Sequence, residues 1–152
     1  MFVCLGNICR SPTAHGIFAA MVAEAGLQSK IAVDSCGTSG WHIGNTPDPR
    51  SIAMAQRRGF DLSTLQASQI KTEDFLDFDY ILAMDNQNLS DLRQVAPGNS
   101  RARVELLLAF DDQSQVTEVP DPYYGGEEGF TLAVELIESA SAKLLSHIRS
   151  TL

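Results

Sequence analysis

Short apolar runs alternate with amphipathic stretches along the chain, and this alternation predicts strands that alternate with helices. The apolar runs cover residues 1–4, 31–33, 80–84 and 104–108. The amphipathic stretches between and after them predict helices over 12–25, 49–58, 88–96 and 130–148. Residues 80–84 are apolar throughout, which is typical of a strand buried on both faces. The order of these elements predicts an α/β fold with a parallel sheet and helices on both faces.

The first predicted helix has the clearest start and stop signals. Ser11 is expected to cap its N-terminus, Pro12 to occupy the first helical position, and Gly26 to end it. Parallel sheets bind their ligands beyond the carboxyl ends of their strands, so the segments that leave the strands at that edge are expected to form the functional site. These segments are the loop after Cys4, residues 35–41 and the loop after Met84.

The length and composition of the chain predict a single folded domain over residues 1–152. Hydrophobic residues make up 44% of it, and no apolar run approaches the roughly 18 residues that a membrane helix needs. The net charge of −8 argues against nucleic acids and anionic membranes as partners. Three cysteines cannot form a disulfide framework, and an odd number fits a reducing compartment. We therefore expect a cytoplasmic protein.

The loop between the first predicted strand and helix has the composition of an anion-binding turn. It reads Cys4-Leu5-Gly6-Asn7-Ile8-Cys9-Arg10-Ser11. Gly6 and Asn7 tolerate the positive φ angles that let successive N–H groups point inward around an anion. The N-terminus of the following helix adds free N–H groups and a positive dipole end, and Arg10 can hold two phosphate oxygens at once. This positive field also favours a thiolate at Cys4, which would then be a nucleophile aimed at phosphorus.

Two residues of this loop have two interpretations each. Ser11 is either a plain helix cap or a cap whose hydroxyl also donates a hydrogen bond to the sulfur of Cys4. Cys9 is either a small buried side chain or a redox partner that traps oxidised Cys4 as a disulfide, which would protect Cys4 from irreversible oxidation. The phosphate itself is expected to be surrounded by Leu5, Gly6, Asn7, Ile8, Cys9 and Ser11.

A thiolate that attacks a phosphoester needs a proton donor for the departing oxygen. The best candidate is Asp121, because the prolines on either side of it keep it extended. Taken alone, this segment is an ordinary turn with an aspartate, and only its combination with the Cys4 loop makes Asp121 a candidate acid. Trp41, Tyr123 and Tyr124 are expected to form the mouth of the cleft and to favour a flat aryl phosphate such as phosphotyrosine. Core packing is the alternative for each of these aromatic residues.

The chain resembles the low-molecular-weight protein tyrosine phosphatase family over essentially its whole length. The motifs that carry the resemblance are the Cys4 loop, Ser35-Cys36-Gly37-Thr38-Ser39 with Trp41, Pro47-Asp48-Pro49-Arg50, Ala83-Met84-Asp85 and Asp121-Pro122-Tyr123-Tyr124-Gly125. The resemblance implies a three-layer fold with a four-stranded parallel sheet. It also implies hydrolysis of phosphotyrosine through a cysteinyl-phosphate intermediate, with no metal and no cofactor.

The resemblance further implies roles for individual residues. Cys4 would be the nucleophile, Arg10 the phosphate clamp, and Asp121 the general acid that later acts as base toward water. The family positions that brace the loop by hydrogen bonds are matched by Asn7, Ser11 and Ser35. The implied partners are tyrosine-phosphorylated proteins and a tyrosine kinase that acts on Tyr123 or Tyr124, and the protein is expected to be a monomer.

The chain departs from the family pattern at three positions. Family members often carry a His and an Arg where this chain has Leu65 and Ser68. Cys36 stands where alanine is usual. Loss of the His is expected to weaken one brace of the loop, so we expect the function to be kept and leave the rate open.

Two related enzymes of the same fold are alternatives to a tyrosine phosphatase. A thiol-dependent arsenate reductase would need further cysteines after the third strand, and residues 85–93 contain none. A phosphoarginine phosphatase would carry Thr in place of Ile8, whose branched apolar side chain suits an aromatic ring. Both features favour the tyrosine phosphatase.

Two alternatives of other classes are also open. A non-catalytic phosphoprotein-binding module would not need the cysteine and the aspartate that this chain keeps. A metal site would draw on four side chains whose spacing lacks the pairing of a zinc finger, namely Cys4, Cys9, His15 and Cys36. The remaining histidines, His42 and His147, are expected on the surface.

Overall fold

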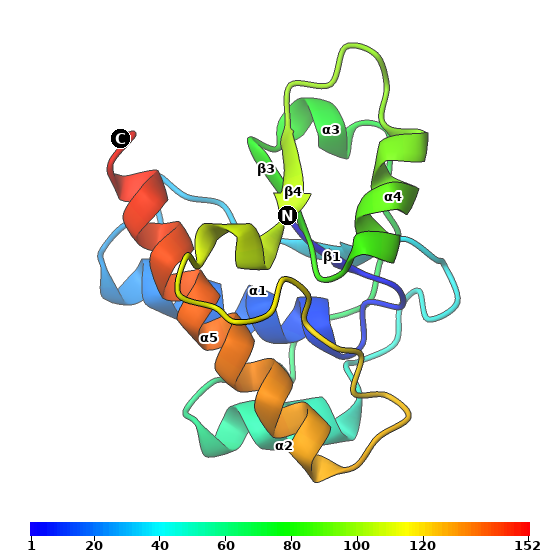
Figure 1. The fold of residues 1–152 in the computed structure, drawn as a ribbon, viewed down its shortest axis with the longest axis vertical. Coiled ribbons are helices and arrows are strands. Elements are labelled where there is room, and N and C mark those ends of the chain that lie inside the picture. Colours follow the sequence, from blue (N-terminus) through cyan, green and yellow to red (C-terminus); the bar gives the residue numbers. More distant parts are fainter.

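The computed structural model describes residues 1–152, and at its centre lies a four-stranded parallel sheet (Figure 1). The strands are β1 (Phe2–Cys4), β2 (Ser35–Gly37), β3 (Tyr80–Ala83) and β4 (Arg103–Leu106). Their order across the sheet is β2-β1-β3-β4, and all pairs are parallel. The chain therefore changes direction of winding between β1 and β3, and ligand sites in such sheets lie beyond the carboxyl ends of the strands at this point.

Helices cover both faces of the sheet, as the sequence predicts. On one face lie α1 (Arg10–Glu24) and α5 (Glu127–Arg149), which contact each other and cross in the view of Figure 1, with α2 (Pro49–Arg57) packed against them. On the other face lie α4 (Asn86–Val95) and the short α3 (Asp74–Asp77). Side chains of a strand alternate between faces, so Phe2 enters the core with α1 and α5 while Val3 enters the core with α4. No helix combines the length and apolar character needed to cross a membrane.

The last helix is held by a single apolar stripe. Five of its buried side chains recur at helical spacing, namely Phe130, Ala133, Ile137, Ala140 and Leu144. Full burial of a side chain such as Ile137 or Leu144 stabilises the fold by about 1.5–3 kcal/mol. The stripe predicted from the sequence is confirmed except for Leu136, which is only partly buried.

The second strand lies further along the chain than the sequence predicts. Residues 31–33 are irregular, and the strand is Ser35–Gly37 instead. Pairing decides the outcome, because β1 begins at Phe2 and the residue beside Phe2 in the register is Ser35. Ile31 and Val33 are partly buried and pack against the core that contains α1, which explains their apolar character. Two short elements were not predicted, namely α3 and the 3-10 helix η1 (Leu107–Phe110).

The start of the first helix also differs from the prediction. Helix α1 begins at Arg10 with Cys9 in the capping position, and no side chain caps it. Ser11 therefore lies inside the first turn, fully buried, and is not the N-cap. Its hydroxyl is directed to the end of β1, where the candidate site begins.

Candidate active site

The loop between β1 and α1 wraps around the sulfur of Cys4. The backbone N–H of Asn7 donates to Cys4 Sγ at 3.3 Å, and Ser11 Oγ lies 3.0 Å from the same sulfur. Asn7 is the one non-glycine residue with a positive φ, at 56°, as the sequence predicts for a tight loop. Gly6 does not have a positive φ, so this part of the prediction is wrong. Its lack of a side chain matters for another reason, because a Cβ at Gly6 would lie 3.0 Å from the ring of His42.

A buried hydrogen-bond network supports this loop from behind. Asn7 Nδ2 donates to Ser11 Oγ at 2.6 Å and to Ser35 Oγ at 3.1 Å. Asn7 Oδ1 accepts the backbone N–H of Ser68 at 3.0 Å, so every polar atom of the amide has a partner. Position 68, where the sequence departs from the family pattern, therefore contributes through its backbone N–H and also through Ser68 Oγ, which donates to the carbonyl of Ser35 at 3.2 Å. Asn7, Ser11 and Ser35 are all buried, and the loop is held rigidly around the sulfur.

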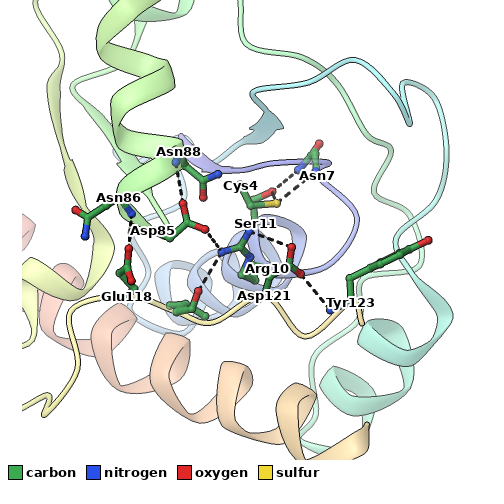
Figure 2. A network of polar contacts seen from close by, with 11 residues as sticks. Cys4, Asn7, Arg10, Ser11, Asp85, Asn86, Asn88, Glu118, Asp121 and Tyr123 are labelled. Carbon is green, nitrogen blue, oxygen red and sulfur yellow. Dashed lines mark hydrogen bonds and ion pairs between the residues drawn. The ribbon is translucent and has the colours of Figure 1, made fainter. Parts of the chain in front are cut away.

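The guanidinium of Arg10 lies between two carboxylates (Figure 2). Arg10 Nη1 donates to Asp85 Oδ2 at 2.6 Å and to the carbonyl oxygen of Val119 at 3.0 Å. Arg10 Nη2 lies 3.5 Å from Asp121 Oδ2. Burial by itself would lower the pKa of Arg10, but the neighbouring acidic groups Cys4, Asp85 and Asp121 outweigh burial and raise the pKa. Arg10 is only 3% exposed, so these partners fix the direction of its side chain.

Asp85 lies in the motif Ala83-Met84-Asp85, and its role in the site was not predicted from the sequence. It follows β3 and caps α4, because Asp85 Oδ1 accepts the backbone N–H of Asn88 at 2.7 Å. Its other oxygen is thereby directed at Arg10, 75 residues away in the sequence. The signal available in the sequence was its place at the carboxyl end of a buried strand, followed by a helix.

The loop, the arginine and the candidate acid meet at one cavity of about 130 Å³. Its lining residues are Cys4, Leu5, Gly6, Ile8, Cys9, Arg10, Trp41, His42, Asp121, Tyr123 and Tyr124. Asn7, Ser11 and Ser35 do not line it and lie behind the loop instead. His42, which was expected on the surface, is half-buried and lines the cavity.

The aromatic residues stand at the mouth of this cavity, as predicted. Trp41 is 74% exposed and Tyr124 is 93% exposed, whereas Tyr123 is 38% exposed. These three side chains are therefore not core residues, and they leave a partly apolar rim around the sulfur. The ring planes of Tyr123 and Tyr124 are nearly perpendicular, with centroids 4.9 Å apart.

The segment that carries Asp121 is tied to the rest of the site at both ends. Before Asp121, the backbone N–H of Val119 donates to the carbonyl of Met84 at 2.8 Å. After it, Arg50 Nη2 donates to the carbonyl of Tyr123 at 3.0 Å. Arg50 also pairs with Asp48, and this hydrogen bond lowers the pKa of Asp48. Asp121 is thus held beside Arg10 by contacts that come from distant parts of the chain.

The other two cysteines have raised pKa values, and the four possible metal ligands do not come together. Burial raises the pKa of Cys9 to about 12 and also raises the pKa of Cys36, so both are protonated thiols at neutral pH. Cys4, Cys9, His15 and Cys36 are not gathered into a group that could hold a metal ion. A larger cavity of about 620 Å³ lies at the amino end of the sheet, and no cysteine lines it.

Comparisons with known proteins agree with this geometry. The family model described as low molecular weight phosphotyrosine protein phosphatase matches residues 1–152. The chain belongs to this family. A phosphatase of this name from Schizosaccharomyces pombe is 47% identical over 131 residues, which cover 86% of this chain and 83% of the relative.

Solved structures show the same relationship. A protein tyrosine phosphatase from Entamoeba histolytica superimposes with a TM-score of 0.93 at 36% identity, covering 99% of this chain and 96% of that one. A Drosophila arginine phosphatase superimposes with a TM-score of 0.91 at 33% identity, covering 97% of this chain and 96% of that one. As a member of the family, this phosphatase is a phosphoric monoester hydrolase that acts on phosphotyrosine-containing proteins.

Proposed function

We propose that this phosphatase hydrolyses phosphotyrosine through a covalent phosphate on Cys4, with Asp121 as acid and base and without a metal. One observation carries the proposal. The sulfur of Cys4 accepts a hydrogen bond from the Asn7 N–H and lies 3.0 Å from Ser11 Oγ. Cys4 lines a cavity that Arg10 and Asp121 also line. Hydrogen bonds and a nearby guanidinium stabilise a thiolate, and a thiolate is the nucleophilic form of cysteine.

In the first step, the thiolate of Cys4 attacks phosphorus. The new S–P bond forms while the P–O bond to the tyrosine oxygen breaks, and the departing oxygen takes a proton from Asp121. The guanidinium of Arg10 stabilises the negative charge on the phosphoryl oxygens during this transfer. Asp121 is placed to donate because its partly exposed carboxyl group lines the same cavity as Cys4.

In the second step, water hydrolyses the intermediate. Asp121, now a carboxylate, accepts a proton from the attacking water. The P–O bond to the water oxygen forms, the S–P bond breaks, and Cys4 returns to the thiolate that Ser11 and the Asn7 N–H stabilise. Inorganic phosphate then leaves, so one carboxyl group serves both steps and the enzyme returns to its starting protonation state.

We propose that the site prefers phosphotyrosine and other aryl phosphates over phosphoarginine. The arginine phosphatase among the structural neighbours makes phosphoarginine the substrate to compare. Ile8 lines the cavity with a branched apolar side chain, and the rim carries Trp41, Tyr123 and Tyr124. The apolar surface of Ile8 favours a phenyl ring over a charged guanidinium, which would lose hydration there, whereas the aromatic rim can contact either group. Phosphotyrosine and phosphoarginine, compared as competing substrates, decide between the two, and a higher kcat/KM for phosphoarginine would overturn the aryl assignment.

We also propose that a tyrosine kinase acts on Tyr124 or Tyr123 and that Cys4 is redox-sensitive. Tyr124 is 93% exposed at the rim, which supports access for a kinase. Cys4 and Cys9 line the same cavity, which supports disulfide formation after oxidation of Cys4.

The experiment that tests the mechanism replaces the nucleophile. Cys4→Ser is expected to abolish turnover of an aryl phosphate while it keeps the fold and the binding of inorganic phosphate. The matched control is Cys36→Ala, which removes a buried thiol that does not line the cavity. Turnover by Cys4→Ser at the rate of the native enzyme would show that another group attacks phosphorus.

A further inference from the structure

His15 is the one histidine in contact with the network behind the Cys4 loop. Helix α1 carries it one turn beyond Ser11, and His15 Nδ1 lies 3.0 Å from Ser35 Oγ. The side chain is half-buried, and this burial lowers the pKa of His15. His15 therefore favours its neutral form, in which one ring nitrogen accepts a hydrogen bond and the other donates.

The direction of each hydrogen bond in the network follows from the Asn7 amide. Asn7 Nδ2 can only donate, so Ser11 Oγ and Ser35 Oγ both accept from it. Each hydroxyl then has its own proton left to donate. The proton of Ser11 has Cys4 Sγ at 3.0 Å and the carbonyl of Cys36 at 3.3 Å within reach. The proton of Ser35 has one acceptor, Nδ1 of His15.

We propose that neutral His15 is a positioning residue for the nucleophile. By accepting the hydroxyl proton of Ser35, His15 fixes Ser35 Oγ as an acceptor for Asn7. The amide of Asn7 is then held so that it donates to Ser11 Oγ, which directs the Ser11 proton to the sulfur of Cys4. The inference rests on the proposed role of Cys4 as a thiolate nucleophile.

Protonation of His15 would reverse the direction of the hydrogen bond between His15 Nδ1 and Ser35 Oγ. His15 Nδ1 would carry a proton and donate to Ser35 Oγ, and the Ser35 hydroxyl proton would be left buried without an acceptor. Two charged groups act on His15: Asp34, which favours the cation, and the amino group of Met1, which opposes it. Because the folded-state pKa of His15 is lowered, the unfolded chain takes up this proton first. Stability is therefore lost as the pH falls below about 6.5, the ordinary pKa of histidine.

A second group titrates in the same pH range and has to be separated from His15. Burial lowers the pKa of the Met1 amino group to about 6. A pH profile of the native protein alone would therefore mix two effects. The difference between the native protein and a His15 variant isolates the contribution of the imidazole, because both proteins keep the same Met1 amine.

The test compares His15→Ala with His15→Asn, whose Oδ1 can accept from Ser35 in the place of Nδ1. The first readout is the pH at which alkylation of Cys4 by iodoacetamide reaches half its maximal rate, followed at Cys4 by mass spectrometry. His15→Ala is expected to raise this pH by about 0.5 to 1 unit, which corresponds to the loss of one hydrogen bond from the network. It is also expected to lower kcat by roughly 3- to 10-fold with little change in KM, and His15→Asn is expected to restore both values.

Two further results sharpen the test. His147→Ala, in the half-buried histidine of α5, is the control that should leave the alkylation profile unchanged. His15→Asn should also lose less stability than the native protein below pH 6.5, because it has no imidazole to protonate. An unshifted alkylation profile in His15→Ala, or a shift that His15→Asn does not reverse, would overturn the inference. Neither result would touch the role of Cys4, which depends on the activity of Cys4→Ser.

Discussion

Replacement of Asp85 by alanine tests how the arginine of the site is positioned. One carboxylate oxygen of Asp85 accepts a hydrogen bond from Arg10 at 2.6 Å. The other accepts one from the backbone N–H of Asn88, in the first turn of α4, at 2.7 Å. The side chain of Arg10 is 3% exposed and that of Asp85 is 23% exposed. Water therefore has little access to Arg10 and is a poor substitute for the carboxylate that the substitution removes. After the substitution, Arg10 keeps only the carbonyl of Val119 and the longer contact to Asp121.

The size of the effect follows from the contacts that are lost. A hydrogen bond to a charged group contributes about 1.5–3 kcal/mol. At 1.36 kcal/mol for each factor of ten, kcat/KM should fall by roughly 10- to 150-fold. Loss of the helix cap should also destabilise the fold by about 1 kcal/mol. Asp85→Asn should fall between the native enzyme and Asp85→Ala, because an amide oxygen can face only one of the two donors.

The assay is steady-state hydrolysis of an aryl phosphate, together with inhibition by inorganic phosphate and thermal unfolding. The matched control is Asp79→Ala. It removes the carboxylate of an exposed ion pair with Arg101 at the other end of β3. Phosphate inhibition should weaken in Asp85→Ala and stay unchanged in Asp79→Ala. A stable Asp85→Ala enzyme with native kcat/KM would refute the idea that Asp85 positions Arg10. Equal losses in both variants would assign the effect to net charge.

Three other changes have defined outcomes. Asp121→Asn should lower kcat/KM, which reports the first step alone, by roughly 10²–10⁴-fold for phenyl phosphates with poor leaving groups and less for good ones, and a uniform loss of kcat/KM across the series would count against an acid. Peroxide should inactivate the enzyme reversibly with a Cys4–Cys9 disulfide in the mass spectrum, and this disulfide should form faster at higher pH once Cys4 is oxidised, because burial raises the pKa of Cys9 to about 12; finding only sulfonate on Cys4 would exclude this protection. Arg50→Ala, which frees the acid segment, should lower kcat roughly 2- to 10-fold, whereas Arg57→Ala should not, and equal rates in both variants would show that the tie has no effect.

Local patterns in the sequence predict much of the fold and the centre of the site. The Cys4 loop is contiguous, so its position between a strand and a helix and the positive φ of Asn7 could be inferred from neighbouring residues. The long apolar stripe of α5 was recognisable for the same reason. The second strand was misplaced because Ser35–Gly37 has no apolar run, and pairing with β1 decides its conformation.

Contacts between distant residues could not be predicted in this way. Asp85 reaches Arg10 across 75 residues, and His15 reaches Ser35 across 20. Both side chains are placed by packing of helices on the sheet, and no local sequence pattern predicts which residue either of them contacts. The half-buried position of His42 against Gly6 likewise depends on how two loops meet above the sheet.

The central claim is that Cys4 carries the phosphate between the two steps, and trapping that intermediate tests it most directly. An aryl phosphate with a good leaving group needs no acid in the first step, whereas hydrolysis of the intermediate needs Asp121 as base. Asp121→Ala, mixed rapidly with such a substrate and quenched in acid, should therefore accumulate one phosphate per protein on Cys4, located by mass spectrometry. Phosphate on another side chain, or release of the phenol during turnover without any protein-bound phosphate, would contradict the account.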